Sequence, residues 1–260
     1  MLCVISPAKS LDFSPAAKDL LASEPMFAED ANLLARTAAR LSRTRLKALM
    51  ALSDELAALN HARFQTFSPE PAGNTTKQAA LAFAGDTYTG LGFNTLEREA
   101  VTYAQDHLRI LSGLYGILRP LDAIQPYRLE MGRRLKVGRA ESLYDYWGER
   151  LAVALDDAAE VAGANFVLNC ASQEYFRAAR AEKMRTAVVT PVFLDEKNGS
   201  AKVISFFAKR ARGAMARYVV ENRVRDPEAL SGFCWEGYAF QKEQSIQLQP
   251  VFLRRERIAA

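Results

Sequence analysis

Apolar runs and helical periodicities alternate along the whole chain. Residues 2–5 and 165–169 are mainly apolar and have the length typical of buried strands. Residues 186–194 and 201–207 are two further strand candidates, and the Asn-Gly pair at residues 198–199 is typical of a tight hairpin turn. The strands are interleaved with helical segments, which predicts a mixed α/β fold with a central mixed sheet and surrounding helices.

Residues 208–223 have the periodicity of an amphipathic helix. At about 100° per residue, their basic side chains fall within an arc of about 160°, opposite a face rich in alanine. These basic residues are Lys209, Arg210, Arg212, Arg217 and Arg223. Residues 197–220 contain no acidic side chain, so we expect a local positive field, either as a phosphate-binding face or as a solvated face.

Residues 43–64 predict a helical hairpin, for which Ser42 and Ser53 are suitable N-cap residues. In a helix-hairpin-helix motif, the hairpin amides and the N-terminus of the second helix meet DNA phosphates. The usual Gly-hydrophobic-Gly hairpin is replaced here by Ser53-Asp54, so a plain helical hairpin is the alternative. As phosphate contacts, the segment offers Arg43, Lys47, Ser53 and Arg63.

The stretch from residue 108 to residue 132 places ionisable side chains in turns, because glycines and prolines interrupt its regular structure. Large apolar neighbours would hold these turns in place, as in many binding loops. With two side chains that follow other predicted strand or helix ends, the stretch supplies six pocket candidates: Lys9, Asp86, Tyr115, Arg119, Arg128 and Glu130. The alternative is a buried ion pair of Glu130 with Arg128 or Arg119 that ties down a long loop.

Charge and motif content limit the classes of function. The net charge is +4, and residues 201–260 hold all of the excess, with 11 Lys and Arg against 6 Asp and Glu. The sequence has no P-loop, dinucleotide fingerprint, nucleophile elbow, or Cys or His pair at metal-ligand spacing, so we expect no bound cofactor or metal. No apolar run approaches 18 residues and the start does not resemble a signal peptide, so we expect a cytoplasmic protein without membrane partners.

Four separated motifs carry a family resemblance. They are ISPAK at residues 5–9, FAGDTYTGL at 83–91, the stretch 108–132, and PVFLDEKNG at 191–199. In this order they strongly resemble the YaaA family of bacterial peroxide-stress proteins. The resemblance implies a compact fold peculiar to the family, a helix-hairpin-helix, a positively charged cleft, and an association with lowering free intracellular iron under peroxide.

We therefore expect one mixed α/β domain over residues 1–260 with a basic cleft. The leading hypothesis is binding of double-stranded DNA without base specificity, which protects DNA or assists its repair under oxidative stress. Its candidate contacts are Arg43, Lys47, Ser53, Arg63, Lys209, Arg210, Arg212 and Arg217. The alternative is an enzyme that acts on an anionic small molecule or nucleotide in a pocket formed by the six candidates above.

Overall fold

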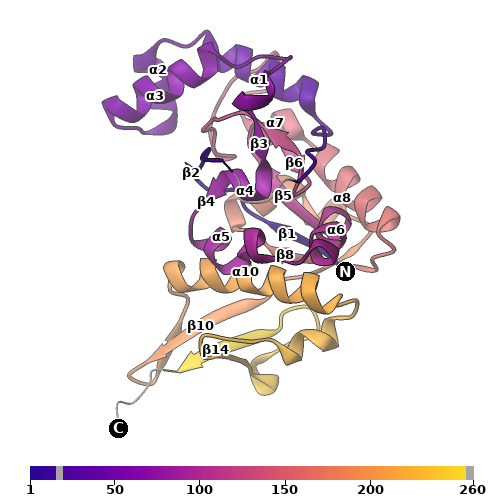
Figure 1. The fold of residues 1–260 in the computed structure, drawn as a ribbon. Helices are drawn as coiled ribbons and strands as arrows, with labels where there is room; N and C mark the ends of the chain where they lie inside the picture. Colours follow the sequence, from indigo (N-terminus) through magenta and orange to yellow (C-terminus); the bar gives the residue numbers. More distant parts are fainter. Residues whose placement is uncertain (16–19, 256–260) are drawn as a thin grey trace.

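Two five-stranded sheets, one on each side of a long helix, organise the computed structural model, which describes residues 1–15 and 20–255 (Figure 1). The first sheet has the order β6-β5-β1-β8-β9. Its strands are β1 (Leu2–Ile5), β5 (Leu108–Ser112), β6 (Gly116–Leu118), β8 (Phe166–Cys170) and β9 (Ala187–Val189). All but β6 run parallel, and every residue of β1 is buried, which explains its uninterrupted apolar sequence.

The second sheet has the order β11-β10-β14-β13-β12. Its strands are β10 (Val192–Lys197), β11 (Ser200–Lys202), β12 (Cys234–Trp235), β13 (Tyr238–Phe240) and β14 (Val251–Arg255). The turn between β10 and β11 places Asn198 and Gly199 at positive φ (53° and 74°), as the Asn-Gly pair predicted. β10 and β14 pair in parallel at the centre of this sheet.

The long helix α10 (Ser205–Asn222) lies between the two sheets and contacts β1, β8 and β10 (Figure 1). It crosses α5 (Asp86–Leu91) at very close range. A Cβ at Gly213 would lie 1.8 Å from the carbonyl oxygen of Thr87, and one at Gly90 would lie 2.0 Å from that of Arg210. Only glycine fits at these two crossing points, which fixes α5 on α10.

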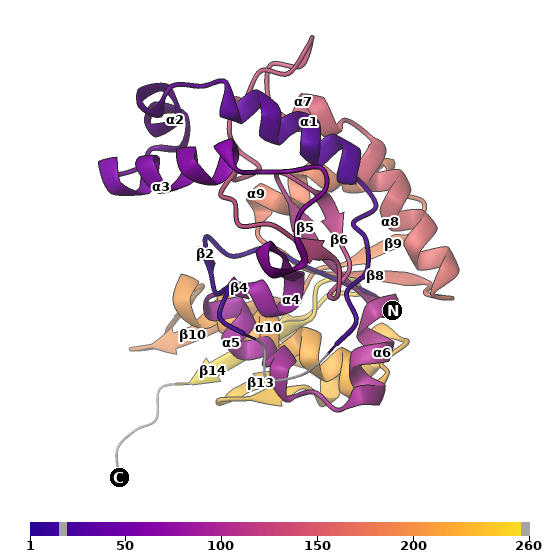
Figure 2. The same cartoon turned by 45° about the horizontal axis from the view of Figure 1, so that its top comes forward.

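The remaining helices cover the first sheet and form a projecting hairpin (Figures 1 and 2). They are α1 (Ala28–Ala39), α2 (Arg43–Met50), α3 (Asp54–Gln65), α4 (Ala79–Ala82), α6 (Arg98–His107), α7 (Leu143–Trp147), α8 (Arg150–Val161) and α9 (Gln173–Phe176). Two small antiparallel ladders join β2 (Ser10–Leu11) to β4 (Phe83–Ala84) and β3 (Lys77–Gln78) to β7 (Ala123–Ile124). Arg150 binds Asp30 at 2.7 Å and so ties α8 to α1, which lie close together in Figure 2.

The mixed α/β class is confirmed, but three details of the prediction are wrong. The strands form two large sheets instead of one central sheet. Residues 186–194 are not one strand, because Pro191 has no N–H to donate and the chain leaves β9 there to begin β10 in the other sheet. In residues 201–207 the strand ends at Lys202 and α10 begins at Ser205.

Within the described residues, none of the helices combines the length and apolar character needed to cross a membrane.

Candidate functional site

A pocket opens where the first sheet reverses its strand order. The chain leaves β1 toward β5 on one side, whereas β8 lies on the other side of β1 and leads to β9. The loops after β1 and β8 therefore diverge, and open α/β sheets bind ligands in the crevice left at such a point. Ser6 follows β1 and Ser172 follows β8, and the Ser172 N–H donates to Ser6 Oγ at 2.8 Å, which holds the two strand ends together.

We call this cavity, of about 340 Å³, the switch-point pocket. Four chain segments line it. They contribute Ser6 and Lys9 after β1, Asp86 and Thr87 from α5, Cys170, Ser172, Glu174 and Tyr175 at and after β8, and Lys209 and Arg212 from α10. Two of the six pocket candidates, Lys9 and Asp86, thus line one cavity together.

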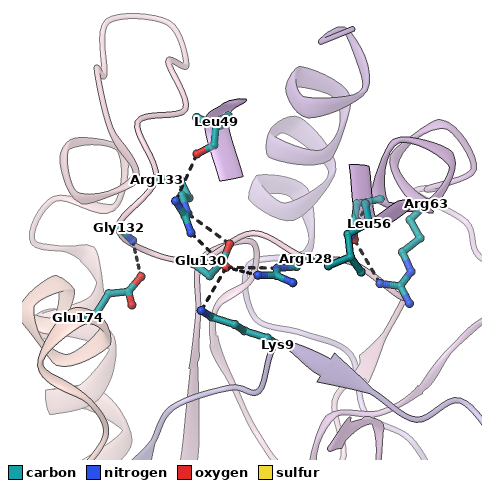
Figure 3. Close-up of polar contacts among 10 residues, drawn as sticks. Lys9, Leu49, Leu56, Arg63, Arg128, Glu130, Gly132, Arg133 and Glu174 are labelled. Carbon is teal, nitrogen blue, oxygen red and sulfur yellow. Dashed lines mark hydrogen bonds and ion pairs between the residues drawn. The ribbon is translucent and has the colours of Figure 1, made fainter. Parts of the chain in front are cut away.

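Beside the pocket, one carboxylate is surrounded by three cations (Figure 3). Glu130 Oε1 lies 3.0 Å from Arg128, 3.3 Å from Arg133 and 3.8 Å from Lys9. We call these four residues the Glu130 cluster. Burial favours a higher pKa for Glu130, but hydrogen bonds from Arg133 and Arg128 outweigh it and hold the pKa below its ordinary value. With Glu130 ionised, the cluster carries a net charge of +2.

A second hollow, of about 410 Å³, lies between β2 and α3. Its lining includes Leu11 of β2 and Arg63 of α3, whereas the adjacent Ser10 lines the switch-point pocket, so the two hollows lie on either side of β2. Burial lowers the pKa of Arg63, whose guanidinium donates to Asn60 Oδ1 at 3.2 Å and reaches no carboxylate in the described chain. We call the two hollows, with the Glu130 cluster beside them, the basic cleft.

The other candidates from residues 108–132 have structural partners. Arg128 makes the ion pair with Glu130 that the sequence offered as the alternative. Arg119 pairs instead with Asp122 at 3.1 Å. Tyr115 is buried, which raises the pKa of its phenol, and its hydroxyl accepts the Gln125 N–H at 3.0 Å. Neither Arg119 nor Tyr115 lines the switch-point pocket.

Of the two alternatives for the basic residues of 208–223, a uniformly solvated face does not match the structure, whereas phosphate binding stays a prediction. Only Lys209 of the proposed phosphate contacts on α10 is exposed. Arg210 pairs with Glu236 at 3.2 Å, and Arg217 pairs with Glu221 at 2.7 Å and donates to Thr95 Oγ1 at 2.7 Å. Arg212 is half-buried at the pocket. The physical reason is that segments distant in sequence supply Glu236 to Arg210 and Thr95 to Arg217, while Glu221 one turn along α10 also pairs with Arg217.

The helix-hairpin-helix is not confirmed. Ser42 and Ser53 are N-caps as predicted, and Ser53 Oγ accepts the Leu56 N–H at 3.3 Å. The first turn of α3, however, carries Asp54 and Glu55, whose negative charges oppose a phosphate at this helix end. Lys47 pairs with Asp54 at 2.9 Å, while Arg43 remains exposed at the start of α2.

Sequence reasoning missed Arg133 and the pairing of Ser6 with Ser172. Arg133 follows Glu130 by three residues, but this spacing indicates an ion pair only on a helix, and the segment is not helical. Ser6 directly follows β1 and Ser172 follows β8 after Ala171, and only the parallel pairing of Ile5 with Cys170 brings the two serines together. No group of three or more His, Cys, Asp or Glu side chains in residues 1–15 and 20–255 is arranged to hold a metal ion.

The sequence of the chain is similar to a known protein family. A family model described as "Peroxide stress protein YaaA" matches residues 1–244. A UPF0246 protein of Ruegeria pomeroyi is 55% identical over 254 residues, which cover 98% of each chain. UPF0246 proteins of Roseobacter denitrificans and Phenylobacterium zucineum are 54% and 49% identical, covering 98% of this chain and 98% and 95% of their own.

Proposed function

The chain belongs to the peroxide stress protein YaaA family, and from this premise we propose that it binds double-stranded DNA through its basic cleft, without base specificity. Binding of this kind would shield DNA or assist its repair during peroxide stress. The observation that supports the proposal is the surplus of positive charge around the cleft, where one buried carboxylate faces three cations and further cations lie on both sides.

Four cations are the best phosphate contacts because they reach solvent and are incompletely neutralised. Lys9 has a 64% exposed side chain and lies 3.8 Å from its carboxylate partner. Arg133 is 27% exposed and shares Glu130 with two other cations. Arg63 and Lys209 have no carboxylate within 4.0 Å among the described residues, and they lie on opposite sides of β2 in the two hollows.

This set revises the contacts proposed from sequence. Lys209 and Arg63 remain in it, and Lys9 and Arg133 join them. Arg210, Arg217 and Lys47 leave it because carboxylates already pair with them. Arg212 leaves it because it is half-buried inside the pocket, where the backbone of a duplex does not reach. Neither Ser53, whose hydroxyl caps α3, nor Arg43, which stands apart from the cleft lining, is needed.

The test is a salt titration of duplex binding, read by fluorescence anisotropy. Four phosphate contacts predict that log K falls with log salt at a slope of about −3.6, and that unrelated duplex sequences bind alike. Arg63→Gln should reduce the slope to about −2.7. Arg255→Gln is the matched control, because this 74% exposed side chain belongs to the second sheet and lines neither hollow of the cleft. A salt-independent affinity, or one that depends strongly on base sequence, would rule out the proposal.

A further inference from the structure

Arg212 is a charged group without a partner in the described part of the chain. It lies on α10 between the two sheets and is half-buried, yet no described carboxylate, carbonyl or hydroxyl accepts a hydrogen bond from it. Its neighbours on the same helix differ, because Arg210 pairs with Glu236 and Arg217 with Glu221. A guanidinium stays protonated in proteins, so this half-buried one keeps its positive charge and its N–H donors available to an anion in the adjoining cavity.

The position of this guanidinium matches a ligand site. Arg212 lines the switch-point pocket and also a neighbouring cavity of about 710 Å³, which is different from the hollow between β2 and α3. The lining of this neighbouring cavity includes Asn169 of β8 and Thr190, which follows β9. Arg212 therefore stands in the crevice that runs past the carboxyl ends of β1, β8 and β9, where α/β sheets of this topology bind small molecules.

Groups suited to phosphate surround the same pocket. Lys209 precedes Arg212 by three residues on α10, so the two cations share one face of the helix, and Lys9 enters from the loop after β1. The hydroxyls of Ser6 and Ser172 lie 3.3 Å apart at the pocket wall, where the hydrogen bond between the strand ends fixes them. An arginine with two amines and fixed hydroxyls can serve several oxygens of one phosphate.

The remaining polar lining indicates what else the ligand carries. Asp86 and Glu174 also line the pocket and would repel a ligand that is anionic throughout. Carboxylates accept hydrogen bonds, so they suit hydroxyl or amino groups on the part of the ligand away from the phosphate. The volume of about 340 Å³ lies at the lower end of the range for small-molecule sites and is too small for a duplex.

We propose that the switch-point pocket binds a small phosphorylated metabolite, of the nucleoside phosphate or sugar phosphate class, whose phosphate is held by Arg212 with Lys9 and Lys209. This function is distinct from DNA binding, although Lys9 and Lys209 would serve both ligands and only Arg212 is specific to the pocket. In this proposal the phosphate is the anionic partner of the Arg212 guanidinium. Asp86 and Glu174 accept hydrogen bonds from hydroxyl or amino groups on the rest of the same ligand.

Isothermal titration calorimetry on the full chain tests the proposal. The probes are inorganic phosphate, a nucleoside monophosphate, a hexose phosphate, the matching unphosphorylated nucleoside, and a dicarboxylate. At least one phosphorylated probe should bind, and the unphosphorylated nucleoside should bind at least tenfold more weakly. Binding of the dicarboxylate alone, or equal binding of nucleoside and nucleotide, would overturn the assignment to phosphate, and so would binding by none of the probes.

Variants separate a ligand role of Arg212 from a structural one. Arg212→Met should weaken binding of the phosphorylated probe at least tenfold, while the melting temperature of the ligand-free protein stays the same or rises, because no ion pair of the described residues is lost with this half-buried side chain. If Arg212 had a structural role instead, the ligand-free Arg212→Met variant would melt at a lower temperature than the wild type. Unchanged binding of the phosphorylated probe by this variant would refute the proposal. If Arg212→Met does not fold, the exposed Lys209→Gln decides the question, with a loss of several-fold expected and no loss contradicting it.

Two further variants keep this outcome distinct from the DNA proposal. Arg63→Gln should reduce duplex binding and leave binding of the phosphorylated probe unchanged, because Arg63 does not line the switch-point pocket. Arg255→Gln should change neither. Each proposal can therefore fail while the other stands.

Discussion

Gly213→Ala tests whether the contact between α5 and α10 holds the fold and its pocket together. The added Cβ would lie 1.8 Å from Thr87 O and 2.8 Å from Leu91 N, both backbone atoms that cannot rotate away. The two helices would have to separate by more than an ångström to restore ordinary contact. The opposing Gly90 would move out of its own contact with Arg210 O at the same time.

The expected cost follows from two opposing effects. Overpacking in a well-packed interior costs up to about 3 kcal/mol. Alanine is favoured over glycine in a helix by about 1 kcal/mol, which offsets part of that cost. We therefore expect the free energy of unfolding to fall by about 2 kcal/mol, and the melting temperature to fall by roughly 4–8 °C for a chain of this size.

Urea denaturation followed by circular dichroism, with calorimetry for the melting temperature, measures the effect. Gly73→Ala is the matched control, because an added Cβ there meets no atom within 4 Å and the change should stay within about 0.5 kcal/mol. If Gly213→Ala is as stable as the wild type or gains the full helix-propensity benefit, the close helix contact described here does not exist.

Two other predictions concern the basic cleft and the hairpin. Glu130→Gln leaves Lys9, Arg128 and Arg133 facing one another and should lower the free energy of unfolding by about 3 kcal/mol at neutral pH. Because the pKa of Glu130 is held below its ordinary value of 4.5, its stabilising contribution is complete above that pH and is lost as the pH falls through the folded-state pKa. The difference between the wild type and Glu130→Gln in urea titrations should therefore shrink in acid, and a constant difference would contradict the ion-pair account. Ser53→Ala should cost about 1 kcal/mol of stability through loss of the α3 cap but leave duplex affinity unchanged, whereas a selective loss of duplex affinity in anisotropy titrations would restore the helix-hairpin-helix interpretation.

Local sequence signals predicted the parts of the site that depend on single strands. The apolar run at β1 placed Lys9 just past a strand end, and the strand at β8 placed Ser172 at the start of α9. These assignments succeeded because a strand buried on both faces is a continuous apolar run, and polar residues mark where it ends. Asp86, at the start of α5, was placed by a different signal, because the apolar run before it forms the short helix α4 and the two-residue strand β4.

Sequence could not predict which of the charges on α10 have partners. Arg217 is bound by Thr95, more than a hundred residues earlier, and Arg210 by Glu236, beyond the end of its helix. Helical periodicity shows the angular positions of these side chains but not the second layer that packs on them. That Arg212 has no partner among residues 1–15 and 20–255 is visible only when the neighbouring segments are in place.

The positions of β1 and β14 have a consequence for synthesis of the protein on the ribosome. β1 precedes every other strand yet lies inside its sheet, and its Cys3 pairs with Leu108. β14 follows every other strand and inserts between β10 and β13. Neither sheet can therefore close on a short nascent chain, and a polypeptide released before Val251 would present two open strand edges to chaperones and proteases.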